Sequence, residues 1–321
     1  MAFGADRIQD RRLTAAMDHP YPGELERDLR SCGRIYFTTH QANDWTVPND
    51  DRSALAWLPT LICVALGGTP DKAQVAQSAW ALLYDASDVI DQIQDSHIDP
   101  SLTPARALSA GIALIFSATE HLGRLPEAWQ AEAYTFLNEM LGGQTEDVIK
   151  ERPTAEEALD IAEKKAGAFM AMGCVLGARC AGAAPDVVAA LEQYGRALGT
   201  MVQIHDDLEL IEGLGKVQPQ TPERYTNVAL AFAWQVLQPA QRDALAEQLT
   251  HYWTTGDASA ARQAYTTLVK SGARLQCAVE AAKRWDRARK AIDAVRFVSA
   301  PEHRMLLALV DGIANAYKAE T

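Results

Sequence analysis

Apolar residues recur every three or four positions over most of this chain, in long stretches rich in Ala, Leu and Glu. Residues with this spacing lie on one face of an α-helix, so each stretch predicts an amphipathic helix. Few stretches show the alternation of apolar and polar residues that is typical of a half-buried strand. The pattern therefore predicts an all-α protein.

Short segments rich in Gly and Pro separate the predicted helices. Such segments stand at residues 67–70, 99–101, 124–127 and 182–186. In the C-terminal part, helices are expected near residues 240–250, 258–270, 273–291 and 299–318. Thr154 is expected to be a helix N-cap, and Gly213–Pro222 is expected to be the longest loop. No repeat or linker divides the chain, so we expect residues 1–321 to form a single large helical domain.

Two short acidic segments stand on otherwise apolar helical stretches, at residues 88–95 and 203–209. At ~100° per residue, Asp88, Asp91 and Asp95 share one face of their helix. Carboxylates stacked in this way repel one another unless a cation lies between them. Mg²⁺ is a hard ion that prefers carboxylates, water and phosphates as ligands. The sequence therefore predicts that two helices facing each other hold Mg²⁺ between their acidic segments.

Charge and composition narrow the class of partner. The chain has 30 basic and 42 acidic residues, a net charge of −12, and 48% hydrophobic residues. This balance argues against nucleic acid or anionic lipid as a partner, but it leaves phosphorylated small molecules open. The five cysteines have no zinc-site spacing and predict buried free thiols in a reducing compartment. Residues 1–12 lack the apolar core of a signal peptide, and no apolar stretch of about 18 residues predicts a transmembrane helix. We therefore expect a cytoplasmic protein.

Several short motifs occur in the order found in a known family. They are Ala65-Leu66-Gly67-Gly68, Asp91-Gln92-Ile93-Gln94-Asp95, Gly143-Gln144 with Asp147, Lys164-Lys165-Ala166, and Gln203 with Asp206-Asp207. On these motifs the chain resembles the all-α class I isoprenoid synthases, and within them the polyprenyl synthetases. It is similar to divergent bacterial members, which include the prenyltransferases that modify peptide pheromones. The resemblance implies a single large helical bundle with a central active-site cavity, and a homodimer.

The activity that the resemblance implies is ionisation of an allylic prenyl diphosphate with Mg²⁺, followed by transfer or rearrangement of the prenyl group. Mg²⁺ would neutralise the diphosphate as the C–O bond breaks. The candidate metal ligands are Asp88, Asp91, Asp95, Asp206 and Asp207. The candidate catalytic residues, which would contact the diphosphate or steady the carbocation, are Lys165 and Gln203. The candidate substrate-binding residues are Arg52, Gln144, Phe169 and Lys216, the last as the cation of a loop that closes over the diphosphate.

Departures from the family pattern leave an alternative open. Chain-elongating members carry Arg-Arg-Gly after the first acidic motif, where this chain has Ser96–Pro100, and Gly-Lys-x-x-Arg near the N-terminal helix, where only Arg52 remains. Both losses fall on the expected isopentenyl diphosphate site, so ionisation is better supported than elongation. The second acidic motif also ends in Leu210 instead of Asp. The alternative is a non-catalytic or partner-subunit member that binds prenyl diphosphate or another subunit.

Overall fold

The computed structural model describes residues 23–32, 51–95, 98, 102–218, 222 and 225–316. Every regular element within these residues is a helix. The prediction of an all-α protein is therefore confirmed. The contacts of the chain group into two compact units, the first formed by Met1–Thr46 with Gln74–Leu125 and the second by Val47–Ala73 with Pro126–Thr321. The single domain over residues 1–321 stays a prediction.

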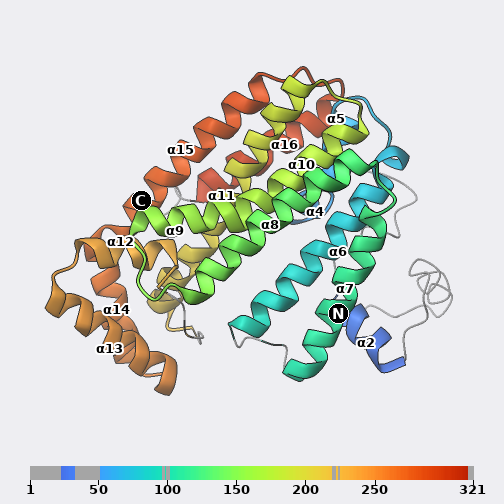
Figure 1. The fold of residues 1–321 in the computed structure, drawn as a ribbon. Helices are drawn as coiled ribbons and strands as arrows, with labels where there is room; N and C mark the ends of the chain where they lie inside the picture. The colour runs from blue at the N-terminus through green and yellow to red at the C-terminus, as the bar shows by residue number, and fades with distance from the viewer. Residues whose placement is uncertain are drawn as a thin grey trace, which may run out of the picture. The chain divides into compact units, whose positions relative to one another are not determined.

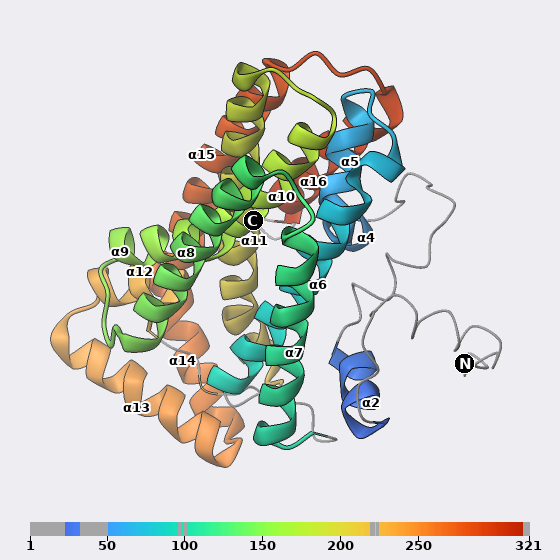
Figure 2. The same cartoon turned by 45° about the vertical axis from the view of Figure 1, so that its right-hand side comes forward.

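The first unit contains α2 (Gly23–Cys32), most of α6 (Pro70–Gln94) and α7 (Pro104–Leu122). Helices α6 and α7 run side by side in both views (Figures 1 and 2). The Arg106 guanidinium on α7 binds the Asp28 carboxylate on α2, with Nε donating to Oδ2 at 2.9 Å. Ala79, Leu82 and Leu83 of α6 are buried, so this face of the helix forms core.

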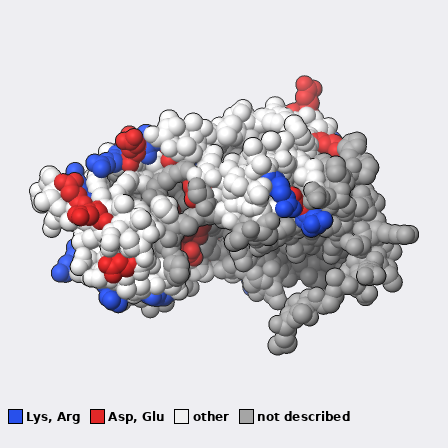
Figure 3. Space-filling view, turned by 90° about the horizontal axis from the view of Figure 1, so that it is seen from below, with Lys and Arg blue, Asp and Glu red and all other residues white. Residues whose placement is uncertain are grey.

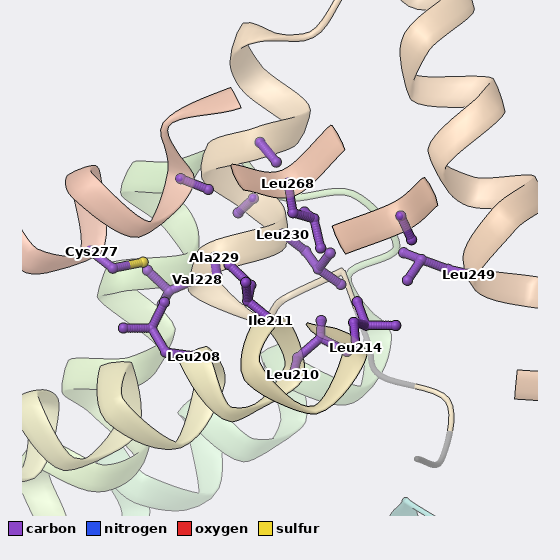
Figure 4. Packing of buried hydrophobic residues seen from close by; sticks show 14 of the residues in the cluster. Leu208, Leu210, Ile211, Leu214, Val228, Ala229, Leu230, Leu249, Leu268 and Cys277 are labelled. Atoms are coloured by element: carbon purple, nitrogen blue, oxygen red, sulfur yellow. The ribbon is translucent and has the colours of Figure 1, made fainter. Parts of the chain in front are cut away.

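The second unit contains the remaining helices. They are α4 (Asp51–Ala56), α5 (Leu58–Ala65), α8 (Glu127–Ile149), α9 (Ala155–Ala162), the π-helical segment η1 (Glu163–Gly167), α10 (Ala168–Cys180), α11 (Pro185–Lys216), α12 (Val228–Val236), α13 (Pro239–Thr255), α14 (Ala258–Ser271), α15 (Ala273–Asp293) and α16 (Ala300–Ala316). Helix α11 is central to this unit, because it contacts η1, α10, α12, α14, α15 and α16. Figure 4 shows the C-terminal part of α11 in an apolar cluster. There Leu208 and Ile211 of α11 lie with residues of α12, α14 and α15, among them Val228, Leu268 and Cys277.

The helix boundaries predicted from the Gly- and Pro-rich segments are confirmed where the structure describes them. Pro70 opens α6, Glu127 opens α8 and Pro185 opens α11. Thr154 is the N-cap of α9: its hydroxyl accepts from the Glu157 N–H at 3.2 Å, and the Glu157 carboxylate accepts from the Thr154 N–H at 2.8 Å. This reciprocal pair satisfies two N–H groups that the helix itself leaves unpaired. Helix α6 ends at Gln94, and the stop expected at residues 99–101 lies outside the described residues.

The loop expected over Gly213–Pro222 is wrong in its first part, because α11 continues to Lys216. Each Gly in a helix costs about 1 kcal/mol relative to Ala. Leu214 is fully buried in the cluster of Figure 4, and burying such a side chain contributes about 1.5–3 kcal/mol. The two glycines, Gly213 and Gly215, together cost about 2 kcal/mol. Burial of Leu214 offsets this cost, and burial of Leu210 and Ile211 in the same stretch of helix exceeds it. The helix ends at Val217, whose φ of 53° lies in the left-handed region.

The surface and the thiols agree with the expectations from composition. Among the described residues, no helix is both long and apolar enough to cross a membrane. Figure 3 shows Asp and Glu side chains interspersed with Lys and Arg side chains on the described part of one face. The thiols of Cys63, Cys174, Cys180 and Cys277 are free and buried, as predicted, whereas Cys32 is only half-buried, so the prediction of burial is wrong for Cys32. Burial raises the pKa of the Cys63 thiol to about 11 and that of Cys180 to about 12. The cytoplasmic location stays a prediction.

Candidate functional site

The acidic face of α6 remains accessible while the opposite face is buried. The Asp88 side chain is exposed, and Asp91 and Asp95 are half-buried. The Asp95 N–H donates to the Asp91 carbonyl at 2.9 Å, so the helical hydrogen bonding keeps these two residues one turn apart. The Gln92 amide donates to the Asp88 Oδ2 at 2.7 Å. Asp91 and Asp95 therefore present two carboxylates on one side of α6 that a ligand can reach.

The second acidic segment, on α11, splits its two aspartates between surface and interior. Asp206 is exposed, whereas Asp207 is buried. Asp207 Oδ1 accepts from the Gln203 Nε2 at 2.9 Å, and Oδ2 accepts from the Val228 N–H at 2.6 Å. The Asn227 amide donates to the Asp207 carbonyl at 3.0 Å. Asp207 thus holds the N-terminus of α12 against α11, and Asp206 is the member of the pair that faces solvent.

Burial has an electrostatic effect on Asp207. It raises the pKa of the carboxyl to about 6, although the hydrogen bonds from Val228 and Gln203 and the nearby Lys165 ammonium act in the opposite direction. Leu210, which stands where the family motif ends in Asp, is only 3% exposed and belongs to the apolar cluster of α11 and α12. The inward face of this segment is therefore structural.

Lys165 lies in η1 and is held by an acidic partner. Its side chain is 19% exposed, and its Nζ donates to Asp147 Oδ2 on α8 at 3.2 Å. Asp147 Oδ1 accepts from the Thr226 hydroxyl, which lies just before α12. The neighbouring Lys164 binds Glu146 at 2.8 Å, so two successive lysines of η1 meet two successive acids of α8. Lys165 is therefore a cation held by Asp147 at a partly exposed position.

Two glycines allow neighbouring helices to approach η1 closely. A Cβ atom on Gly143 of α8 would lie 2.7 Å from the backbone nitrogen of Lys165, and one on Gly199 of α11 would overlap the Ala166 carbonyl oxygen. Neither position therefore accommodates a larger residue unless the backbone shifts. Single-turn π segments of this kind are frequent at functional sites. Close packing on both sides thus fixes the backbone that carries Lys165.

The structure also locates the other predicted substrate-binding residues. Gln144 is half-buried on α8, and Phe169 is buried on α10. The prediction that Lys216 is the cation of a loop is wrong, because burial of Leu214 extends α11 to Lys216. The Lys216 side chain is 62% exposed, and its Nζ lies 3.7 Å from Glu212 Oε2. The side chain of Arg52 lies outside the described residues, as do residues 96, 97, 99 and 100 of the segment that replaces the family's Arg-Arg-Gly.

Three residues with a part in this arrangement were not among the predicted site residues. The sequence analysis gives Asp147 only as the last residue of a motif and assigns no role to Thr226 or Asn227. A signal for Asn227 exists, because it precedes an apolar run and its side chain accepts from the Leu230 N–H at 3.1 Å as the N-cap of α12. The link from Thr226 to Asp147 joins residues 79 positions apart, and no local pattern indicates it.

The carboxylates of α6 fit the chemistry of Mg²⁺. Mg²⁺ in phosphate-binding sites is held through one or two carboxylates, with water and substrate phosphates completing its octahedron. Asp91 and Asp95 supply two such oxygen donors one helical turn apart. Within the described part of the chain, no group of three or more His, Cys, Asp or Glu side chains converges on one point. That Asp91 and Asp95 hold Mg²⁺ stays a prediction.

Comparison with known proteins identifies relatives by sequence. A family model described as polyprenyl synthetase matches residues 57–268. The short chain isoprenyl diphosphate synthase of Methanothermobacter thermautotrophicus is 32% identical over 179 residues, which cover 50% of this chain and 55% of that protein. The (2E,6E)-farnesyl diphosphate synthase of Mycobacterium tuberculosis is 31% identical over 179 residues, which cover 50% of each. The chain thus spans about half the length of the curated relatives that it matches.

Solved structures extend the similarity over nearly the whole fold. The polyprenyl synthetase from Streptomyces coelicolor A3(2) superposes with a TM-score of 0.71 and 24% identity, covering 95% of this chain and 96% of that one. The geranylgeranyl pyrophosphate synthetase from Pyrococcus horikoshii Ot3 gives a TM-score of 0.67 and 19% identity, covering 91% of this chain and 98% of that one. These matches confirm the predicted isoprenoid synthase fold. The assignment to the branch that modifies peptide pheromones stays a prediction.

Proposed function

Because this chain belongs to the polyprenyl synthetase family, we propose that it is a Mg²⁺-dependent prenyltransferase that ionises an allylic prenyl diphosphate. The observation that carries the proposal is the extent of the family match. Residues 57–268 include both acidic segments and Lys165. The curated relatives are named as isoprenyl and farnesyl diphosphate synthases, which supports a prenyl diphosphate as the substrate class.

Each candidate residue has a role that its environment supports. Asp91 and Asp95 would hold Mg²⁺, which when bound supplies neutralising charge to the departing diphosphate. Lys165 would donate hydrogen bonds to the diphosphate oxygens while Asp147 keeps its ammonium in place. Asp206 is exposed and is the proposed ligand of a further Mg²⁺. Asp207 has both carboxylate oxygens engaged by Gln203 and Val228, so we assign it a supporting role rather than a metal contact.

We further propose that the prenyl group passes to an acceptor other than isopentenyl diphosphate, or rearranges within the site. Binding a second diphosphate requires a second group of cations. The chain has Ser96–Pro100 where the family's arginine pair stands, and Arg52 is its one candidate near the N-terminal helix. An acceptor without a diphosphate needs neither the arginine pair nor the cations near the N-terminal helix. This choice leaves the ionisation step unchanged.

A second candidate function has one observation in its favour. Leu210 occupies the last position of the second acidic motif and is buried in the apolar cluster, so it supplies no carboxylate there. A member with one incomplete metal-binding segment could bind prenyl diphosphate, or another subunit, without turning it over. Binding of a prenyl diphosphate with no release of pyrophosphate would favour this function over catalysis.

We also propose that the protein is a homodimer. Helix α8 carries Tyr134, Leu141 and Val148, which are all exposed and spaced by seven residues. Helix α7 also exposes apolar side chains, at Leu108, Ile112 and Phe116, but these are spaced by four residues. Apolar residues at a seven-residue spacing form the seam between packed helices, and a second copy of the same chain would offer a matching row.

The test of catalysis is incubation with geranyl, farnesyl or geranylgeranyl diphosphate and Mg²⁺, with and without isopentenyl diphosphate, followed by mass analysis of products and measurement of pyrophosphate. Asp91→Ala and Asp95→Ala should each lower pyrophosphate release by about 10²-fold, because each removes a major electrostatic contact. Asp243→Ala, which removes an exposed acid on α13, is the matched control and should keep the wild-type rate. Unchanged turnover in both α6 variants would refute the mechanism.

A further inference from the structure

We propose that Thr226 is a positioning residue, whose hydroxyl fixes the Lys165 ammonium through the Asp147 carboxylate. The inference rests on the proposed function in one respect, namely that Lys165 binds the diphosphate. Thr226 itself is buried and lies just before α12, far in the sequence from both Asp147 and Lys165.

The hydrogen bonds define a short relay. The Thr226 hydroxyl donates to Asp147 Oδ1, and Lys165 Nζ donates to Asp147 Oδ2 at 3.2 Å. Because one carboxylate oxygen accepts from the hydroxyl, the plane of the carboxylate is fixed and Oδ2 is directed at Lys165. The ammonium has three donors and can keep one on Asp147 while the others meet phosphate oxygens.

The position of Thr226 is itself fixed by the second acidic segment. The next two residues, Asn227 and Val228, donate to the carbonyl and the carboxylate of Asp207 at 3.0 and 2.6 Å. Asn227 also caps α12. The residues from Thr226 to Val228 therefore connect Asp207 on α11 with Asp147 on α8. A displacement at either end would be transmitted to Lys165.

The arrangement gives Lys165 a defined place before any anion binds. A lysine side chain has a flexible four-carbon stem, and ordering it on binding costs conformational entropy. A carboxylate that is free to rotate would instead turn both oxygens to the ammonium and hold it more tightly. Loss of the Thr226 hydroxyl should therefore draw Lys165 toward Asp147 and weaken its contact with a phosphate.

The test compares Thr226→Val, which keeps the shape and removes the hydroxyl, with Thr226→Ser, which keeps the hydroxyl. The dissociation constant for pyrophosphate with Mg²⁺, measured by calorimetry, and the KM for the allylic diphosphate should rise about tenfold in Thr226→Val. Thr226→Ser should stay within about twofold of wild type. In a Lys165→Met background, Thr226→Val should add no further loss. If Thr226→Val does not fold, Thr226→Ala, which leaves space beside the carboxylate, replaces it.

A second readout needs neither substrate nor turnover. Acetylation of Lys165 by acetic anhydride, followed by mass spectrometry, should slow about twofold or more in Thr226→Val because the ammonium is held by two oxygens. Lys164, which pairs with Glu146 and Asp160, is the internal control and should keep its rate.

Equal acetylation of Lys165 in wild type and Thr226→Val would overturn the inference, as would a loss of pyrophosphate affinity that persists without Lys165. A wild-type protein that binds no pyrophosphate would instead refute the proposed function, and the acetylation result would still decide the role of Thr226.

Discussion

Two adjacent glycines of α8 allow a direct test of how closely η1 packs on this helix. A Cβ on Gly143 would lie 2.7 Å from the backbone nitrogen of Lys165 and 2.8 Å from the Lys164 Cβ, whereas a Cβ on Gly142 would meet nothing within 4 Å. Ordinary contact begins at 3.4 Å, so Gly143→Ala requires η1 to move by about 0.7 Å. Overpacking of this kind costs about 1–3 kcal/mol, and the better helix propensity of Ala returns about 1 kcal/mol.

We therefore expect Gly143→Ala to lower the free energy of unfolding by up to about 2 kcal/mol, and Gly142→Ala to raise it by about 0.5–1 kcal/mol. Urea denaturation followed by far-ultraviolet circular dichroism measures both. The two variants have the same composition, helix and chemistry, so their difference isolates the contact with η1. Equal stability of the two variants would refute the close approach of α8 to Lys165.

Two further predictions concern Asp207 and the exposed face of α8. Burial raises the pKa of Asp207 from 3.8 to about 6, so the folded protein binds this proton more tightly than the unfolded chain, and the contribution of this group to stability should fall as the pH rises from about 4 to about 6. This loss is on the order of 3 kcal/mol. Denaturation at a series of pH values should therefore show that the stability of the wild type relative to Asp207→Asn falls over this range; a constant difference would contradict the assignment. Leu141→Glu should convert a dimer to a monomer in light scattering, while Val269→Glu, at an exposed apolar position on α14, should not; a monomeric wild type would rule out the dimer.

Local signals in the sequence determined much of the helical framework. Pro70 and Pro185 each stand at the first position of a helix, where the missing N–H has no cost. Thr154 and Glu157 form a capping box that involves only residues within one turn. Asp91 and Asp95 share a face because helical geometry alone places residues four apart together. Each of these features depends only on residues close together in the sequence, so the sequence by itself was sufficient to predict it.

The end of α11 shows where local reasoning fails. Gly213 and Gly215 indicate a loop, but Leu214 between them is fully buried, and the helix continues through all three. Whether a residue is buried depends on segments distant in the sequence, here α12 and α14 in the apolar cluster. The free energy of burying Leu214 together with Leu210 and Ile211 exceeds the cost of placing the two glycines in a helix.

Tertiary structure also decided what each charged residue of the site contacts. The sequence names Asp206 and Asp207 as candidate metal ligands, and the structure shows that Asp207 turns inward to hold the start of α12. Lys165 binds Asp147, which lies 18 positions away in the sequence. Asp147 in turn accepts from Thr226, which lies 79 positions from Asp147. These contacts form because helices pack closely enough for their side chains to meet. Periodicity specifies the face on which a charge lies, and only the packing of distant helices specifies its partner.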